Sequence, residues 1–269
     1  MESESNKRKK SSFFKQNYKK CKPNKGLLAE GMTGFIVTCN FKEYHCLKEG
    51  YNLLNEFADK LYGNNALKTE PDVDIETAVQ NEINSIKNNE KRFQQMITKC
   101  NNVLFIKSND KSVDPLVICS EILKEIETNG KQLTQQLLRL IPIVTTFESN
   151  SNFDEIIETN LEKQTKESIS FVIQCKVRNN SKVKKMDLIE RVVTIVKKVR
   201  PDWTVDFSQP KLTIDLEVLH KTICLSFLKD YQNYCKYNLI EFSKKCLKRL
   251  EETLKTEIKE EDIKIETNI

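Results

Sequence analysis

The stretch I-S-F-V-I-Q-C-K-V-R at residues 169–178 alternates apolar and polar side chains and decides the fold of its half of the chain. Alternation with a period of two is typical of a half-buried β-strand. After a polar turn, apolar residues recur at the spacing of a helix, at Leu188, Val192, Ile195, Val196 and Val199. The phrase V-D-F-S-Q-P-K-L-T-I-D-L-E-V at 205–218 then leads into two apolar runs, 212–218 and 223–227. The sequence therefore predicts a strand, a helix and two more strands in one domain.

The preceding part of the chain has its own periodic segments. Apolar patterns predict strands at 34–40, 92–97, 102–107 and 133–143, and helices at 43–62 and 113–126. Asn129-Gly130 is a helix stop signal. An acidic insertion near 64–90 is expected to be helical, with Asp74 as its cap. Without the insertion, the order is the β-α-β-β-α-β of a ferredoxin-like fold, so we predict an α+β protein with a ferredoxin-like domain at 31–143.

Six short phrases give the chain a family resemblance. They are G-F-I-V-T-C-N at 34–40, Y-N-L-L-N-E at 51–56, R-F-Q at 92–94, N-N-V-L-F-I-K at 101–107, L-R-L-I-P-I at 138–143 and K-Y-N-L at 236–239. In this order, together with the phrase at 205–218, they resemble the THUMP domain-containing adaptor proteins of eukaryotic tRNA cytidine acetylation. The resemblance implies that residues 144–240 form a THUMP domain, a small RNA-binding fold found in tRNA-modifying enzymes.

The resemblance also implies a function. It points to a non-catalytic adaptor that presents a D-arm cytidine of tRNA to a separate RNA cytidine acetyltransferase, which makes acetylcytidine. The expected partners are that acetyltransferase and tRNA, held by its acceptor end, with serine and leucine tRNAs implied by the family. The expected location is the nucleus, with the nucleolus and the cytoplasm as alternatives. No run approaches the roughly 18 apolar residues of a membrane span, so we expect no membrane partner.

The net charge of +5 is unevenly distributed. Residues 1–25 carry nine basic and two acidic side chains, a net charge of +7, which leaves −2 for residues 26–269. We therefore expect residues 1–30 to form a disordered basic arm. Its run Lys7-Arg8-Lys9-Lys10 is suited to RNA binding or to nuclear import. Residues 241–269 mix acidic residues with lysines and are predicted to form a charged, helix-prone tail.

Few residues are suited to catalysis. The six glycines all lie at or before residue 130, and no glycine-rich phosphate loop is present, so we expect no cofactor and no enzyme activity. Cys39, His45 and Cys46 are close in sequence, but a zinc site needs four ligands, and buried structural cysteines are expected instead.

The best functional candidates lie in the loop after the strand at 169–178. The predicted RNA-binding residues are Arg178, Asn179, Asn180, Lys182, Lys184, Lys185 and Arg191. Their side chains are not needed for a core, and the free amides at a helix N-terminus attract phosphate. The two asparagines could hydrogen-bond sugar or base edges. The alternative is a solvated loop with incidental lysines.

Two further residues have competing interpretations. Trp203 could stack on a base, but a lone tryptophan before an apolar strand more often covers a core. His220 is expected in a solvated turn between two strands. For the chain as a whole, two alternatives to the adaptor remain open: a protein-interaction scaffold with a THUMP-like fold that no longer binds RNA, and an enzyme with an unrecognised active site.

Overall fold

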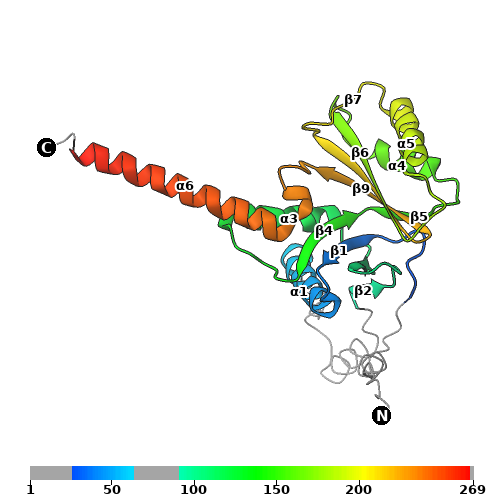
Figure 1. The fold of residues 1–269 in the computed structure, drawn as a ribbon, viewed down its shortest axis with the longest axis horizontal. Helices are drawn as coiled ribbons and strands as arrows, with labels where there is room; N and C mark the ends of the chain where they lie inside the picture. Colours follow the sequence, from blue (N-terminus) through cyan, green and yellow to red (C-terminus); the bar gives the residue numbers. More distant parts are fainter. Residues whose placement is uncertain (1–25, 64–90, 267–269) are drawn as a thin grey trace, which may run out of the picture.

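The computed structural model describes residues 26–63 and 91–266, and their strands form two sheets that lie side by side with helices against each (Figure 1). The predicted basic arm at 1–25 and the predicted insertion at 64–90 lie outside these residues. No helix in the described part is both long and apolar enough to cross a membrane.

The first sheet has the strand order β2-β3-β1-β4, and every neighbouring pair is antiparallel. Its strands are β1 (Gly34–Cys39), β2 (Phe93–Met96), β3 (Val103–Ser108) and β4 (Leu137–Ile143). Helices α1 (Glu43–Tyr62) and α3 (Pro115–Asn129) pack against it and against each other. Each element predicted within the described residues of this half is present, with boundaries shifted by a few residues at most.

Helix α3 begins and ends at residues that suit those positions. The carboxylate of Asp114 accepts a 2.8 Å hydrogen bond from the Leu116 amide, and Pro115 supplies the first helical residue without an unpaired amide. At the other end, Gly130 has a φ of 62°, and its amide bonds to the carbonyl oxygen of Ile126. This confirms the predicted stop signal, because glycine adopts the left-handed conformation without strain.

The second sheet has the strand order β5-β9-β8-β6-β7. Its strands are β5 (Thr145–Glu148), β6 (Ser170–Arg178), β7 (Thr204–Val205), β8 (Leu212–Leu219) and β9 (Thr222–Lys229). Strand β6 runs parallel to both β7 and β8, whereas β9 is antiparallel to β8 and β5. Two helices, α4 (Asp154–Glu162) and α5 (Lys185–Val199), complete this half. Strand β5 and helix α4 were not predicted.

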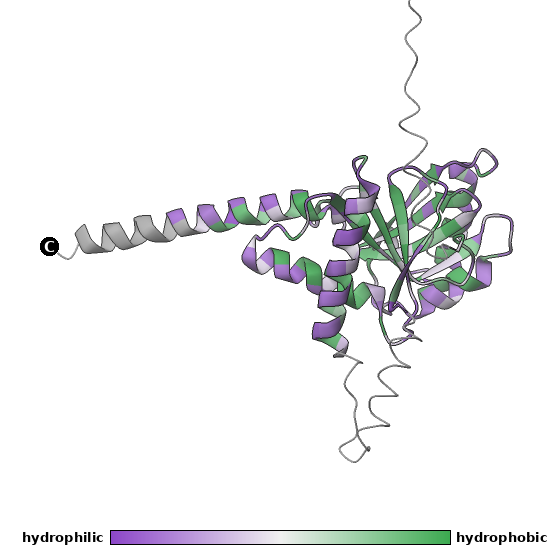
Figure 2. Ribbon diagram, turned by 90° about the horizontal axis from the view of Figure 1, so that it is seen from below, coloured by the Kyte–Doolittle hydropathy of each residue, from purple (hydrophilic) through white to green (hydrophobic). Residues whose placement is uncertain are grey.

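Strand β8 is buried on both faces. Its apolar residues Ile214, Leu216 and Val218 join the core beneath α4 and α5. On the opposite face Leu219 belongs to the core of the first sheet, whereas Thr213, Asp215 and Glu217 are buried polar or charged residues. The central strands are accordingly the most hydrophobic part of the ribbon (Figure 2). Because the second sheet shares a core with the first, the two halves pack into one body.

Helix α6 (Leu239–Glu266) covers most of the segment 241–269, which was predicted to be a charged, helix-prone tail, and its first turns also pack in a core. Phe242 and Cys246 are 1% exposed and pack in the core of the first sheet, next to α3. The charged pattern of this region concealed the short apolar face that docks the start of the helix. Beyond that face the helix continues away from both sheets (Figure 1).

Two sequence-based interpretations are confirmed. Trp203 is 5% exposed and covers the core: its ring packs beside Phe171, and its indole N–H donates to the carbonyl oxygen of Glu167 at 3.0 Å. Cys39 and Cys46 are buried in the first core. Burial raises the pKa of both thiols, and the charge of Glu43 adds to this effect.

Candidate nucleic-acid interface

The loop between β6 and α5 is shaped by Asn180. Its side-chain oxygen accepts hydrogen bonds from the amides of Lys182 and Val183, at 2.8 and 2.9 Å, which folds the chain back toward α5. Its side-chain nitrogen donates to the carbonyl oxygen of His220, in the β8–β9 turn. This combination of acceptor and donor explains why asparagine occupies the position.

Asn179 holds the same loop against the first half of the molecule. It has a φ of 51°, in the left-handed region that asparagine tolerates better than most residues. Its side-chain amide donates to the carbonyl oxygen of Lys99, between β2 and β3. The side-chain nitrogens of both predicted asparagines therefore donate hydrogen bonds within the protein. Contact between these amides and RNA stays a prediction.

Three lysines of this loop project into solvent. Lys182, Lys184 and Lys185 are exposed and form no salt bridge with any residue in the described ranges. We call them the loop lysines. Lys184 and Lys185 stand at the start of α5, whose first turn has no side-chain cap. The unpaired amides and the dipole of α5 add positive potential at this point, so the loop lysines can bind an anionic ligand.

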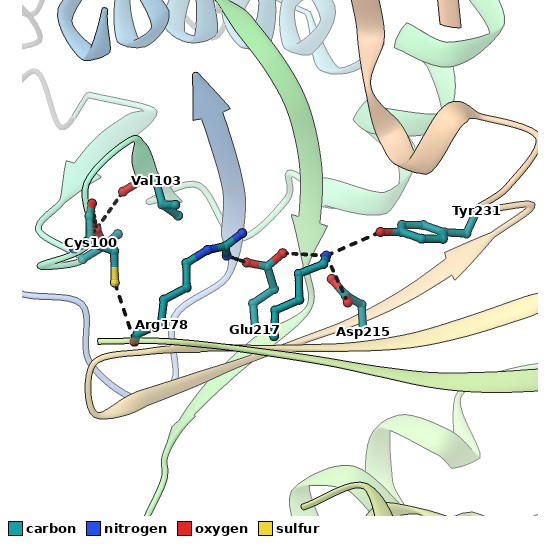
Figure 3. Close-up of polar contacts among 8 residues, drawn as sticks. Cys100, Val103, Arg178, Asp215, Glu217 and Tyr231 are labelled. Atoms are coloured by element: carbon teal, nitrogen blue, oxygen red, sulfur yellow. Dashed lines mark hydrogen bonds and ion pairs between the residues drawn. The ribbon is translucent and has the colours of Figure 1, made fainter. Parts of the chain in front are cut away.

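Arg178 is close in sequence to the loop lysines, but its side chain forms an ion pair within the sheet. It is the last residue of β6, and its guanidinium is paired with the buried carboxylate of Glu217 on β8 (Figure 3). Its side chain is 34% exposed. Removing Arg178 would therefore leave a buried charge, so this residue serves the sheet as well as any ligand.

The pair belongs to a larger buried group (Figure 3). Lys176 Nζ lies 3.0 Å from Glu217, 3.6 Å from Asp215 and 3.4 Å from the hydroxyl of Tyr231. Strand register explains the arrangement, because Lys176 is the direct partner of Glu217 across β6 and β8. Glu217 thus bridges two basic side chains of β6, and Asp215 shares one of them.

Burial sets the titration of this group. Asp215 is fully buried, and neither carboxylate oxygen has a hydrogen-bond partner. Desolvation therefore raises the pKa of Asp215 to about 7, although the charge of Lys176 opposes the shift. For Lys176, burial lowers the pKa, but the charges of Asp215 and Glu217 outweigh it and the net pKa is raised.

These inward-facing charges were missed by the sequence analysis. The available signal was two acidic residues, Asp215 and Glu217, at alternate positions of an otherwise apolar strand. Lys176 and Arg178 have the same spacing on β6. Opposite charges with a shared period of two indicate paired faces of neighbouring strands. Parallel pairing of β6 with β8 was needed to see that they meet.

Unlike the loop lysines, Arg191 is engaged in contacts within the protein. Its guanidinium binds the carboxylate of Asp154 at 2.7 Å and the side-chain oxygen of Asn152 at 2.9 Å, and it lies over the ring of Phe153. These contacts clamp α5 to the start of α4. RNA binding by Arg191 thus competes with a structural role. The predicted basic-arm residues Lys7, Arg8, Lys9 and Lys10 are outside the part of the chain that the structure covers.

Comparison with known proteins assigns the second half of the chain. Residues 150–228 match the sequence model of the THUMP domain. THUMP domain-containing protein 1 of Bos taurus is 33% identical over 81% of this chain and 65% of its own length. The chain thus spans about two thirds of that relative.

Two other proteins are similar to parts of the chain. The tRNA acetyltransferase TAN1 of Saccharomyces cerevisiae is 26% identical over 83% of this chain and 89% of its own. The solution structure of the THUMP domain of THUMP domain-containing protein 1 is 29% identical, with 30% of this chain and 92% of that chain covered and a TM-score of 0.27.

Proposed function

The chain belongs to the family of THUMP domain-containing protein 1, and we propose that it is a tRNA-binding adaptor without catalytic activity. It holds tRNA and presents a D-arm cytidine to a separate RNA cytidine acetyltransferase, which forms acetylcytidine. Serine and leucine tRNAs, gripped at the acceptor end, are the proposed cargo. The name of the yeast relative, a tRNA acetyltransferase, supports acetylation as the associated chemistry.

The exposed loop lysines are the observation that carries tRNA binding. A folded RNA is recognised largely through phosphate and 2′-hydroxyl contacts, which need unpaired cations on an accessible surface. Lys182, Lys184 and Lys185 meet that need, whereas Arg178 and Arg191 are paired with carboxylates. The loop is also anchored by Asn179 and Asn180, so the lysines are held in place before RNA arrives.

In the adaptor role, this chain recognises tRNA and the separate acetyltransferase performs the chemistry. Glycines, which a phosphate-cradling cofactor loop requires, are absent from the sequence after residue 130. A protein that fixes tRNA at one end places a distant base at a defined position, because tRNA has a fixed shape. Binding then raises the effective concentration of that base at the acetyltransferase, with no chemistry by this chain.

We further propose four segments for the chain. They are a basic arm at 1–30, a ferredoxin-like domain at 31–143 with its insertion near 64–90, a THUMP domain at 144–240 and the segment 241–269. The strand order β2-β3-β1-β4 with antiparallel pairing supports the ferredoxin-like interpretation. The buried Phe242 and Cys246 attach the start of the last segment to the first domain. A nuclear location, with the nucleolus or cytoplasm as alternatives, goes with this function.

A binding experiment tests the central step. We expect the triple variant K182A/K184A/K185A to bind tRNA at least 10-fold more weakly than the wild-type chain, because it removes three phosphate contacts. The matched control is K163A/K166A/K197A. These three lysines are exposed, form no salt bridge within the described residues, and lie toward the other ends of α4 and α5.

The comparison separates position from bulk charge, since both variants lose three positive charges. Both sets should leave the melting temperature nearly unchanged, because exposed charges contribute little to stability. Equal losses of affinity in the two variants would contradict the proposed interface. No measurable binding of tRNA by the wild-type chain would favour the alternative, a protein-interaction scaffold.

A further inference from the structure

Phe41 is an exposed aromatic residue in a strained backbone conformation. Its side chain is 89% exposed and its φ is 62°. A bulky residue rarely adopts a left-handed conformation, because its Cβ crowds the backbone. The ring gains almost nothing from burial, so packing does not explain why phenylalanine occupies this position. Strained residues of this kind cluster at functional sites, where surrounding contacts hold them.

Asn102 holds the backbone of Phe41 in place. The Asn102 side-chain oxygen accepts a 3.0 Å hydrogen bond from the amide of Phe41. The amide of Asn102 in turn donates to the carboxylate of Glu43 at 2.7 Å, and its carbonyl oxygen accepts from the amide of Cys39. The loop between β1 and α1 is therefore tied on both sides of Phe41, and the ring is presented outward from a fixed backbone.

The surroundings of Phe41 are suited to a polyanion. Lys42 and Lys48 are exposed and, within the described ranges, form no salt bridge. They line a polar cavity of about 270 Å³ together with His45 and Glu49. Glu49 repels an anion less than its charge suggests, because one of its oxygens accepts from three successive amides, 135–137. The cavity thus offers two cationic side chains, one of which, Lys42, directly follows Phe41 in the chain.

This region is continuous with the loop lysines. The turn between β2 and β3 touches both: Asn102 bonds to Phe41, Lys99 accepts from Asn179, and the thiol of Cys100 lies 3.8 Å from the carbonyl oxygen of Arg178. Lys99 Nζ also lies 3.5 Å from the His220 ring, beside the same loop. The β2–β3 turn therefore links the loop of Lys182 to the loop of Phe41, and Lys99 adds a cation between them.

We propose that Phe41 stacks on an unpaired base of the bound RNA, while Lys42 and Lys48 contact the neighbouring phosphates. The inference rests on the proposed function and extends it to the first domain. An exposed ring flanked by cations is the arrangement that binds unpaired nucleotides, because every base has a stacking face and every linkage a charge. Lysine is depleted at protein–protein interfaces, whereas here Lys42 and Lys48 accompany the exposed rings of Phe41 and Tyr44, so a protein partner is disfavoured.

The test compares two exposed phenylalanines. In the full-length chain, Phe41→Ala should weaken tRNA binding by about 5- to 150-fold, the range expected for one stacked base. Phe207→Ala is the control, because Phe207 is 81% exposed and lies near the start of β6, at the opposite end of the sheet from the loop lysines. Its loss should leave tRNA affinity unchanged. Unchanged affinity in Phe41→Ala would overturn the stacking proposal.

Two more variants distinguish stacking from a structural role. Phe41→Gly removes both the ring and the backbone strain, so it should keep or raise the melting temperature while weakening tRNA binding. A lower melting temperature with unchanged affinity would assign Phe41 to the fold instead. Phe41→Trp should retain affinity, and its added fluorescence should be quenched when tRNA binds. No quenching at saturating tRNA would contradict stacking.

The proposed function can fail separately from this inference. If K182A/K184A/K185A weakens tRNA binding and Phe41→Ala does not, only the stacking proposal falls. If the wild-type chain binds no tRNA, both fall. If Phe41→Ala leaves tRNA affinity intact but abolishes stimulation of the acetyltransferase, the ring contacts that protein and the stacking proposal is overturned.

Discussion

The side-chain amide of Asn179 donates a 2.8 Å hydrogen bond to the carbonyl oxygen of Lys99, a residue 80 positions earlier in the chain. The bond joins the loop that carries the loop lysines to the turn between β2 and β3. Asn180 fixes the other side of the loop through the carbonyl oxygen of His220. The lysines are thus oriented by two asparagines that contact both halves of the molecule.

Deleting these contacts should lower stability to different extents. Asn180→Ala removes one donor and an acceptor of two amide hydrogen bonds, and we expect a loss of about 1–2 kcal/mol in the free energy of unfolding. Asn179→Gly removes one hydrogen bond but suits the φ of 51°, so its loss should be below about 1 kcal/mol. Denaturant unfolding measures both, and a larger loss for Asn179→Gly would contradict this assignment.

The buried Asp215 should make stability depend on pH. Its pKa is raised to about 7 in the folded chain, whereas its ordinary value is 3.8. The folded state therefore holds a proton that the unfolded state has lost, and the contribution of Asp215 to stability falls as the pH rises from about 4 to about 7. In Asp215→Asn this pH dependence should vanish. The free energy of unfolding of the variant should therefore rise relative to that of the wild type as the pH goes from about 4 to about 7.

Asp206 provides a control of opposite sign. Hydrogen bonds from the side chain and amide of Ser208 and from the Gln209 amide lower the pKa of Asp206. Its contribution is present above the unfolded pKa and is lost as the pH falls, so the difference between wild type and Asp206→Ala should shrink in acid. Urea unfolding at several pH values measures both differences. A wild type that gains stability over Asp215→Asn between pH 4 and 7 would show that the carboxyl is charged throughout.

Gly130 should be more sensitive to an added side chain than Gly31, a second glycine with a similar left-handed backbone. A Cβ at this position would lie 3.0 Å from the Leu247 Cα of helix α6 and would also strain the φ of 62°. Gly31 has a similar φ of 72° but nothing within 4 Å of the added atom. Gly130→Ala should therefore cost about 1–3 kcal/mol more in unfolding free energy than Gly31→Ala. Equal costs would mean that α6 does not pack closely on the end of α3.

The basic arm can be tested by salt dependence. We expect deletion of residues 1–25 to weaken tRNA binding and to flatten the slope of log affinity against log salt, because each phosphate contact contributes up to about 0.9 to that slope on duplex DNA. The melting temperature should not change. An unchanged slope would assign Lys7-Arg8-Lys9-Lys10 to nuclear import alone.

Local patterns predicted much of the fold. The alternation through Phe171 and Cys175, the helical spacing of Leu188 and Val192, and the stop signal at Gly130 each depend on neighbours in sequence, and the corresponding elements are present. Helix α4 and strand β5 were not predicted, because each is too short to show a clear periodic pattern. The docking of α6 was not predicted, because Phe242 and Cys246 are buried by residues far away in sequence.

The candidate site was less predictable for the same reason. Sequence alone marks Lys182, Lys184 and Lys185 as a basic loop, but it cannot show that Arg178 and Arg191 are paired with distant carboxylates. Nor does it show that Asn179 reaches Lys99. Long-range partners separate cations that are free for a ligand from those that serve the fold.

Reconstitution of tRNA acetylation tests the adaptor function most directly. Acetylcytidine would be measured by mass spectrometry in tRNA incubated with acetyl-CoA and this chain, with the RNA cytidine acetyltransferase, or with both, and the loop-lysine variant would replace the wild type in a parallel set. The account predicts no product from this chain alone, a large rise when both proteins are present, and loss of that rise with K182A/K184A/K185A but not with K163A/K166A/K197A. Acetylcytidine formed by this chain alone, or an acetyltransferase that works equally well without it, would contradict the account.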